Sequence, residues 1–222
     1  MTDQVSSLYV LDPEASRITF KVDGGRLSNA VMAAALILFL APLLLVLAAA
    51  VRWQDGGPAL FRQTRIGRDG KTFGCLKFRS MAVDAEERLH RLLDTDPEAR
   101  VEWASQHKLK CDPRITRLGL FLRRSSLDEL PQLFNVLVGD MELVGPRPVV
   151  EAEAVRYGRR FREYCRVRPG ITGLWQVSGR SDTTYRRRVA MDVVYSRAKS
   201  PSLDFRILLA TIPAVLLRRG SC

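Results

Sequence analysis

A long uncharged segment constrains this chain more than any other feature of its sequence. Residues 30–51 form a run of 22 residues without a charged side chain, rich in Leu and Ala. As an α-helix this run would be about 33 Å long, and the hydrocarbon core of a bilayer is about 30 Å thick. We therefore predict a membrane helix over residues 29–53, preceded by a leader over residues 1–28.

A proline near the centre of this run leaves the path of the helix open. Pro42 removes one backbone hydrogen bond, so it either bends the helix or breaks it. Basic residues flank the run on both sides, with Arg26 before it and a larger cluster from Arg52 onward, and the positive-inside rule gives no clear orientation. The residues alone permit either one kinked span or a helix-break-helix that enters and leaves through the same face.

The remainder, residues 54–222, is long enough for one folded domain. The formal net charge of +11 points to polyanionic partners, which include nucleic acid, anionic lipid and phosphorylated substrates. The four cysteines are widely spaced and form no C-x-x-C pair, so we expect neither a zinc site nor a disulfide framework. The two histidines, His90 and His107, stand in polar segments where we expect them at the surface.

Turn signals and apolar periodicity predict an α/β fold that is mainly helical, with one short β-hairpin. Residues 59–66 and 72–78 are the predicted strands, because Asp69-Gly70 between them is a strong hairpin-turn signal. Residues 82–110 predict two helices with solvated polar faces. The apolar run at 207–217 is too short to span a bilayer and predicts an interfacial or a buried helix.

Two adjacent carboxylates, Asp128 and Glu129, follow an arginine-rich stretch at a predicted helix start. A structural explanation makes Ser126 the N-cap and Glu129 the partner residue of a capping box. A functional explanation makes one carboxylate a nucleophile or base and lets the other hold a divalent cation, while arginines bind phosphate oxygens. The spacing of the pair fits both explanations.

A helix and then two loops rich in glycine and proline are predicted after this pair. The helix should end by Gly139 and bury the apolar residues that recur at helical spacing, namely Leu127, Leu130, Leu133, Phe134 and Leu137. Residues 145–148, Gly-Pro-Arg-Pro, hold Arg147 in an extended segment between rigid neighbours, which aims its guanidinium group. Residues 168–180 form a second loop punctuated by glycines.

Five motifs in this order carry a family resemblance. They are KFRSM at residues 77–81, DPRIT at 112–116, SLDELPQ at 126–132, VGPRP at 144–148 and RPGITGLWQ at 168–176. Together they closely resemble the bacterial sugar transferase family, the monotopic polyprenyl-phosphate phosphoglycosyl transferases. The resemblance runs from about residue 28 to the last residue, and the set is specific although each motif alone is weak.

The resemblance implies an enzyme that transfers a sugar 1-phosphate from a UDP-sugar to undecaprenyl phosphate and releases UMP. This is the priming step of exopolysaccharide or other surface glycan synthesis. Carried over to this chain, Asp128 would attack the β-phosphorus, and Glu129 with Asp128 would hold Mg²⁺. The side chains expected to contact phosphate are Lys77, Arg79, Arg114 and Arg147.

The resemblance also implies a topology. The segment over residues 29–53 would be re-entrant, with both ends and the catalytic domain at the cytoplasmic face of the bacterial inner membrane. Three positions depart from the family pattern: Ala41 replaces the Ser of the Ser-Pro break, Asn29 stands near a usual Asp, and Glu142 stands where Ser is frequent. The charge of Glu142, close to Arg147 in sequence, is a candidate for tuning sugar or metal contacts.

The expected partners are the two substrates and membrane lipid, and no nucleic acid. Either a monomer or a homodimer fits the sequence. Residues 180–195 are candidates for sugar or nucleotide selection, but the sugar itself is not readable. The rival hypothesis is a membrane-anchored basic interaction protein without catalysis, against which the acidic pair and Pro-Arg-Pro argue, because a simple charge patch needs neither.

Overall fold

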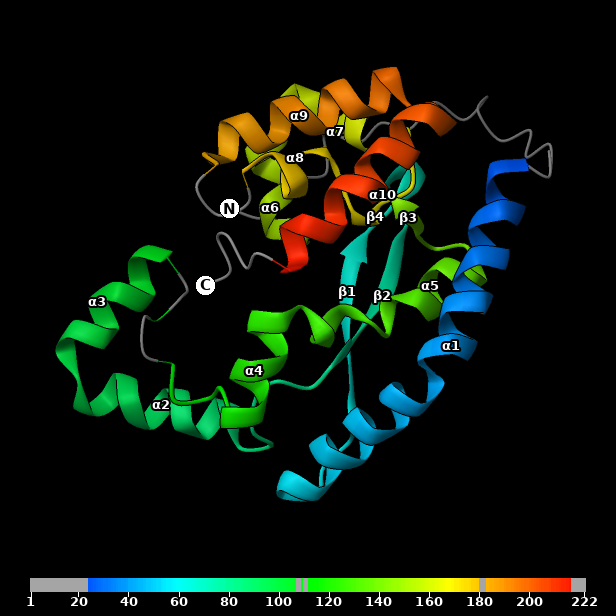
Figure 1. Cartoon of the computed structure of the whole chain (residues 1–222). Helices are drawn as coiled ribbons and strands as arrows, with labels where there is room; N and C mark the ends of the chain where they lie inside the picture. Colours follow the sequence, from blue (N-terminus) through cyan, green and yellow to red (C-terminus); the bar gives the residue numbers. More distant parts are fainter. Residues whose placement is uncertain (1–23, 107–108, 110–111, 180–182, 217–222) are drawn as a thin grey trace.

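The computed structural model describes residues 24–106, 109, 112–179 and 183–216, and Figure 1 shows their arrangement. The helices are α1 Gly24–Asp55, α2 Ala85–Thr95, α3 Pro97–Gln106, α4 Arg117–Ser125, α5 Gln132–Val138, α6 Glu151–Tyr157, α7 Phe161–Tyr164, α8 Leu174–Ser178, α9 Tyr185–Ala198 and α10 Pro201–Leu216. The strands are β1 Leu60–Ile66, β2 Thr72–Phe78, β3 Glu142–Val144 and β4 Gly170–Thr172. The prediction of a mainly helical fold with a short antiparallel hairpin is confirmed.

Helix α1 runs without interruption through Pro42 and extends beyond the predicted 29–53 at both ends. Figure 1 shows it curving along one side of the domain. Within the described ranges, it is the one helix whose length and composition would let it cross a membrane. One side packs on the domain through Leu44, Leu47 and Val51, while residues such as Leu38 and Phe39 are exposed. The predicted break at Pro42 is therefore a position inside a continuous helix.

The hairpin of β1 and β2 forms as predicted, in register from Leu60 opposite Phe78 to Ile66 opposite Thr72. Asp69 and Gly70 both have positive φ, 58° and 73°, as a tight hairpin turn with the strand twist requires. Figure 1 shows the hairpin running between the group of α6 to α10 and the group of α2 to α4. It thereby carries residues of β2 from one part of the domain to the other.

A second strand pair was not predicted from the sequence. Strands β3 and β4 pair in parallel, with Glu142 opposite Gly170 and Val144 opposite Thr172. The interpretation of residues 168–180 as an irregular loop is wrong where β4 and α8 form. The pairing needs glycine, because a Cβ on Gly170 would lie 2.0 Å from the backbone nitrogen of Gly145. Three-residue strands are too short to show a period in sequence.

The predicted buried face of the helix after the acidic pair is partly wrong. Leu133 is buried in α5, but Phe134 and Leu137 are exposed. The reason is that Leu127 lies on a separate 3₁₀ turn and α5 begins only at Gln132. The helical spacing that starts at Leu127 therefore does not predict which residues of α5 are buried. The helix does end at Gly139, which adopts the left-handed conformation.

The remaining predictions on helices agree with the described residues. The two polar-faced helices are α2 and α3, and His90 is exposed on α2. The apolar run at 207–217 belongs to α10, which buries Ile207 and exposes Leu209 and Ile212. Cys75 and Cys165 are free thiols. His107, Cys111 and Cys222 lie outside the described residues.

Candidate active site

The acidic pair lies on a 3₁₀ turn, Leu127–Glu129, between α4 and α5. Ser126 precedes the turn in the left-handed conformation with φ 58°, which is unusual for a residue with a side chain and is favoured at functional sites. The Ser126 side chain makes no capping hydrogen bond. The capping-box explanation is therefore wrong, and the Glu129 carboxylate serves other partners.

Those partners are two cations that arrive from separate elements. Lys77 on β2 donates to Glu129 Oε1 at 2.7 Å, and its Nζ lies 3.9 Å from Asp128 Oδ2. Arg147, from the loop after β3, places Nη2 at 3.1 Å from the same Glu129 oxygen. The fold thus brings together four of the residues predicted for the site, Lys77, Asp128, Glu129 and Arg147, although they are far apart in sequence.

The two carboxylates have opposite electrostatic environments. Asp128 is only 9% exposed, and burial, followed by the neighbouring charge of Glu129, raises its pKa. Burial also disfavours the charged form of Glu129, but Arg147 and Lys77 outweigh it and lower the pKa of Glu129 to about 2. Glu129 in return raises the pKa of Arg147. Adjacent carboxylates whose pKa values are driven apart can take different chemical roles.

Asn135 ties α5, the helix that follows the acidic pair, to β2. Its side-chain oxygen accepts from the Leu76 backbone N–H at 2.9 Å, and its amide nitrogen donates to the Gly74 carbonyl at 2.8 Å. One side chain thereby bonds the free edge of β2 as another strand would, directly beside Lys77. Sequence analysis missed Asn135, although a polar residue inside the apolar run LFNVLV was the available signal.

The β3–β4 pair fixes the backbone of the Pro-Arg-Pro loop through hydrogen bonds. Gly145 donates its N–H to the Thr172 carbonyl at 2.8 Å, and the Pro146 carbonyl accepts from Gly170 at 2.9 Å. Arg65 on β1 donates to the Pro148 carbonyl at 2.9 Å. Burial, and then the nearby charge of Arg147, lowers the pKa of Arg65. Arg65 is a member of the site that sequence analysis did not identify.

A crevice at this cluster is nearly closed. It measures about 10 Å³ and is lined by Arg65, Lys77, Glu129 and Arg147, among others. The cations are therefore packed onto Glu129 in this conformation. A substrate phosphate would have to take the place of these contacts.

Two predicted phosphate ligands lie with other carboxylates. Arg79 is ion-paired with Asp55 at the end of α1. Arg114 binds both carboxylate oxygens of Asp112, with Nη2 at 2.7 Å, and stacks 4.7 Å from the centroid of the Trp103 ring. The structure does not bring either arginine to the acidic pair, so phosphate contact by them stays a prediction.

Arg123 is a further cation near Asp128 that was not singled out from the sequence. Its Nε donates to Ser80 Oγ at 2.8 Å. Burial lowers the pKa of Arg123, and its charge in turn acts to lower the pKa of Asp128. It comes from α4, just before the acidic pair, and adds a third positive charge that acts on Asp128.

Glu142 pairs with cations other than Arg147, and its tuning of sugar or metal contacts stays a prediction. It is 6% exposed on β3, where it pairs with Lys199 and with Arg168 at 3.5 Å. Asn29, the other departure in this region, accepts from the Leu143 backbone N–H at 2.9 Å and so ties α1 to β3. Glu142 and Asn29 thus both stabilise β3, the strand that leads to Arg147.

The donor set for a metal is small. Among the described residues, no group of three or more His, Cys, Asp or Glu side chains is placed to hold an ion. Asp128 and Glu129 provide two adjacent carboxylates. Mg²⁺ is held in many phosphate-transfer sites by one or two carboxylates together with substrate phosphates and water. The pair supplies carboxylates of this kind, and Mg²⁺ binding there stays a prediction.

Comparison with known proteins gives a consistent result. The model of the bacterial sugar transferase family matches residues 23–218. The undecaprenyl-phosphate galactose phosphotransferase of Salmonella typhimurium is 53% identical over 76% of this chain and 35% of its own length. The UDP-galactose-lipid carrier transferase of Erwinia amylovora is 51% identical over 88% of this chain and 41% of its own length.

A third relative is closer to this chain in length. The exopolysaccharide production protein ExoY of Rhizobium meliloti is 49% identical over 84% of this chain and 82% of its own length. The chain therefore spans about two fifths of the Salmonella and Erwinia proteins, but most of ExoY. Since the match covers nearly the whole sequence, the chain belongs to the bacterial sugar transferase family.

Proposed function

We propose that this chain transfers a sugar 1-phosphate from a UDP-sugar to undecaprenyl phosphate and releases UMP, as the priming step of exopolysaccharide or another surface glycan. The observation that carries the proposal is that the two carboxylates of the acidic pair have different partners. Glu129 is held ionised by Lys77 and Arg147, while Asp128 is largely buried beside it without a direct hydrogen bond from either cation. The substrates named for the Erwinia and Salmonella relatives support the substrate classes.

Asp128 is the proposed nucleophile in a two-step exchange. In the first step a carboxylate oxygen of Asp128 bonds to the β-phosphorus, and the bond from that phosphorus to the bridging oxygen breaks. The electron pair leaves with UMP. In the second step a phosphate oxygen of undecaprenyl phosphate attacks the same phosphorus, and Asp128 leaves as a carboxylate. Covalent catalysis by a carboxylate is established chemistry at phosphorus.

The surrounding cations reduce the repulsion between the nucleophile and the diphosphate. Two like charges at about 4 Å cost several kcal/mol in a partly dry site. Lys77 and Arg147 already converge on this position, and exchange of their contacts from Glu129 to phosphate oxygens would place positive charge on the transferring group. Arg79 and Arg114 would first have to leave Asp55 and Asp112 to contribute.

Glu129 and Asp128 are the proposed holders of Mg²⁺, together with the substrate diphosphate. The ion would supply charge neutralisation at the transferring phosphoryl group. The residues of the chain position it: Glu129 is ionised throughout the physiological range, since its pKa is about 2.

The membrane brings the second substrate to the site. We propose that α1 is re-entrant at the cytoplasmic face of the bacterial inner membrane, turning back by a bend near Pro42 within its continuous helix, with residues 54–222 on that face. The exposed apolar side of α1 supports membrane contact, and its buried side joins it to the domain through Leu44 and Leu47. A polyprenyl chain in the bilayer would then present its phosphate beside the domain.

Labelling of the covalent intermediate tests the proposal. The full chain in detergent would be mixed with Mg²⁺ and a UDP-sugar that is radiolabelled at the β-phosphorus, without lipid acceptor. We expect UMP release in about equal amount to the enzyme, and label on the peptide that contains Asp128. Asp128→Asn should lose both signals, whereas the exposed Asp94→Asn should keep both.

Two results would overturn the covalent mechanism: full turnover by Asp128→Asn, or turnover by the unchanged chain without any labelled protein. Salt-sensitive binding to anionic lipid with no UMP release from any UDP-sugar would favour the rival interaction protein. A screen of UDP-sugars with undecaprenyl phosphate, scored by UMP release, would identify the sugar.

A further inference from the structure

A second pocket lies away from the acidic pair, between α9 and the segment that joins α6 to α7. Its volume is about 340 Å³, within the lower range of small-molecule sites. Four arginines line it, Arg156, Arg159, Arg160 and Arg186, and its lining contains no acidic residue. We call it the arginine pocket. It shares no lining residue with the crevice at Lys77 and Glu129.

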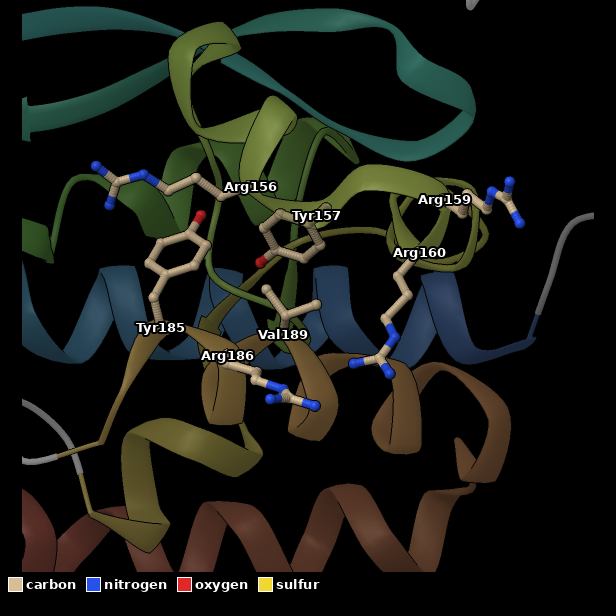
Figure 2. A pocket seen from close by; sticks show the side chains of 7 residues that line it. All are labelled: Arg156, Tyr157, Arg159, Arg160, Tyr185, Arg186 and Val189. Atoms are coloured by element: carbon tan, nitrogen blue, oxygen red, sulfur yellow. The ribbon is translucent and has the colours of Figure 1, made fainter.

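Two of these guanidinium groups converge. Figure 2 shows Arg160 and Arg186 extending toward one another across the surface beside Val189, Arg160 from the turn after α6 and Arg186 from the first turn of α9. Arg159 points away from the pocket in the same view. Like charges that approach from separate elements repel, and an anion between them would remove this repulsion.

These arginines lack counter-ions, while others nearby have them. In the part of the chain that the structure describes, no ion pair involves Arg156, Arg160 or Arg186, although exposed Arg166 and Arg197 both pair with Glu163 at 3.1 Å. Exposure alone therefore does not explain the unpaired state of the pocket arginines.

The back of the pocket is fixed by aromatic and buried groups. The Arg156 guanidinium stacks 5.0 Å from the centroid of the Tyr185 ring, and that ring meets Tyr157 edge-on at 6.1 Å. The Tyr157 hydroxyl donates to Asp192 Oδ2 at 2.7 Å in the interior. The wall is thus ordered without using Arg160 or Arg186, which leaves both free to bind a ligand.

We propose that the arginine pocket binds a phosphate-bearing anion, with Arg160 and Arg186 as the groups that hold its phosphoryl oxygens. Guanidinium groups match phosphate geometry through paired N–H donors, and two of them suit a pyrophosphate or a phosphate monoester. The same chemistry is offered by a soluble phosphate compound and by a lipid phosphate. This site is additional to the proposed transferase centre and does not depend on it.

Calorimetric titration of the full chain in detergent tests the site. One arm uses inorganic pyrophosphate, and the other uses dioctanoyl phosphatidic acid as a lipid phosphate. The pocket variant is Arg160→Gln with Arg186→Gln. The matched control is Arg162→Gln with Arg187→Gln, two exposed arginines on α7 and α9 that do not line the pocket. Both double variants lose the same net charge.

We expect at least one probe to bind the unchanged chain. The pocket variant should weaken that binding by about tenfold or more, since the loss of one charge-assisted hydrogen bond typically raises Kd by about tenfold. The control should remain within about threefold of the unchanged chain, because Arg162 and Arg187 do not line the pocket and so lose no direct contact with a bound anion. The arm that binds more tightly identifies the source of the phosphate.

Equal weakening by both double variants would overturn the proposal, since it would mean general charge attraction. The proposal would also be overturned if neither probe bound. It would likewise be overturned if Lys77→Gln abolished the binding and the pocket variant did not, because the probe would then bind at the acidic pair. Melting curves of both variants in the same detergent establish that they are folded. Because the readout is binding, the proposal survives or fails independently of UMP release.

Discussion

Lys77 binds Glu129 at 2.7 Å and stays 3.9 Å from Asp128, although the two carboxylates are neighbours in sequence. Both residues lie on the 3₁₀ turn after left-handed Ser126, but only Glu129 accepts a hydrogen bond from Lys77. The result is one carboxylate with a pKa of about 2 and one whose pKa is raised. The proposed roles of metal holder and nucleophile follow from this difference.

Replacement of Glu129 with Gln should lower kcat by about 100-fold, comparable to the loss of one electrostatic group at a transition state. Without the Glu129 charge, Lys77 and Arg147 are released to pair with Asp128, which makes Asp128 a poorer nucleophile. Single-turnover labelling at Asp128 should be slowed but still complete. Unchanged labelling rates would contradict the separation of roles.

Replacement of Arg123 with Gln should shift the acid limb of the pH-rate profile to higher pH. The positive charge of Arg123 acts to lower the pKa of Asp128, so its removal raises that pKa further and activity is lost at a higher pH on acidification. The exposed Arg117 at the start of α4 gives the matched control, Arg117→Gln. Equal shifts in both variants would indicate a general charge effect instead.

Local signals in the sequence predicted the hairpin and four members of the cluster. Asp69-Gly70 fixed the turn, and the extended Pro-Arg-Pro segment indicated that Arg147 would be aimed. The partners of the other arginines were not readable: Asp55 lies at the end of the apolar helix and captures Arg79 only because β2 returns beside α1. The β3–β4 pairing joins residues about 28 apart through three-residue strands, which leave no local period.

Asn135 should be essential for holding α5 on β2. Asn135→Leu leaves the Leu76 N–H and the Gly74 carbonyl without their side-chain partner, and we expect a loss of about 2–4 kcal/mol in unfolding free energy. Asn135→Asp can still accept from Leu76 but, when ionised, places a charged oxygen against the Gly74 carbonyl, so its loss should be at least as large. Denaturant titration in detergent measures both.

The exposed Leu137 on the same helix supplies the control for Asn135. Leu137→Ala should change stability by much less than Asn135→Leu, because an exposed side chain loses little contact on truncation. A similar loss in all three variants would mean that α5 is sensitive to any substitution, and would remove the special role of the amide.

The re-entrant path of α1 predicts the accessibility of the N-terminal segment. In a chain with its four native cysteines replaced by Ser, Ser7→Cys should be shielded from an external, membrane-impermeant thiol reagent in intact cells. It should react after the inner membrane is permeabilised. Reaction in cells whose inner membrane is intact would mean that α1 spans the bilayer. A cysteine at exposed Val155 in the domain reports on the cytoplasmic side.

Asp192 should make stability depend on pH. Burial raises the pKa of this carboxyl to about 7 from its ordinary 3.8, so the folded chain retains a proton that the unfolded chain releases. Its contribution to stability is full below about pH 4, declines by about 1.4 kcal/mol per pH unit toward pH 7, and is constant above about pH 8.

Asp192→Asn cannot titrate, and the Asn oxygen can still accept from Tyr157. The difference in unfolding free energy between the unchanged chain and Asp192→Asn should therefore fall between about pH 4 and 7 and then level off. A difference that is independent of pH would show that Asp192 is already ionised in the folded chain.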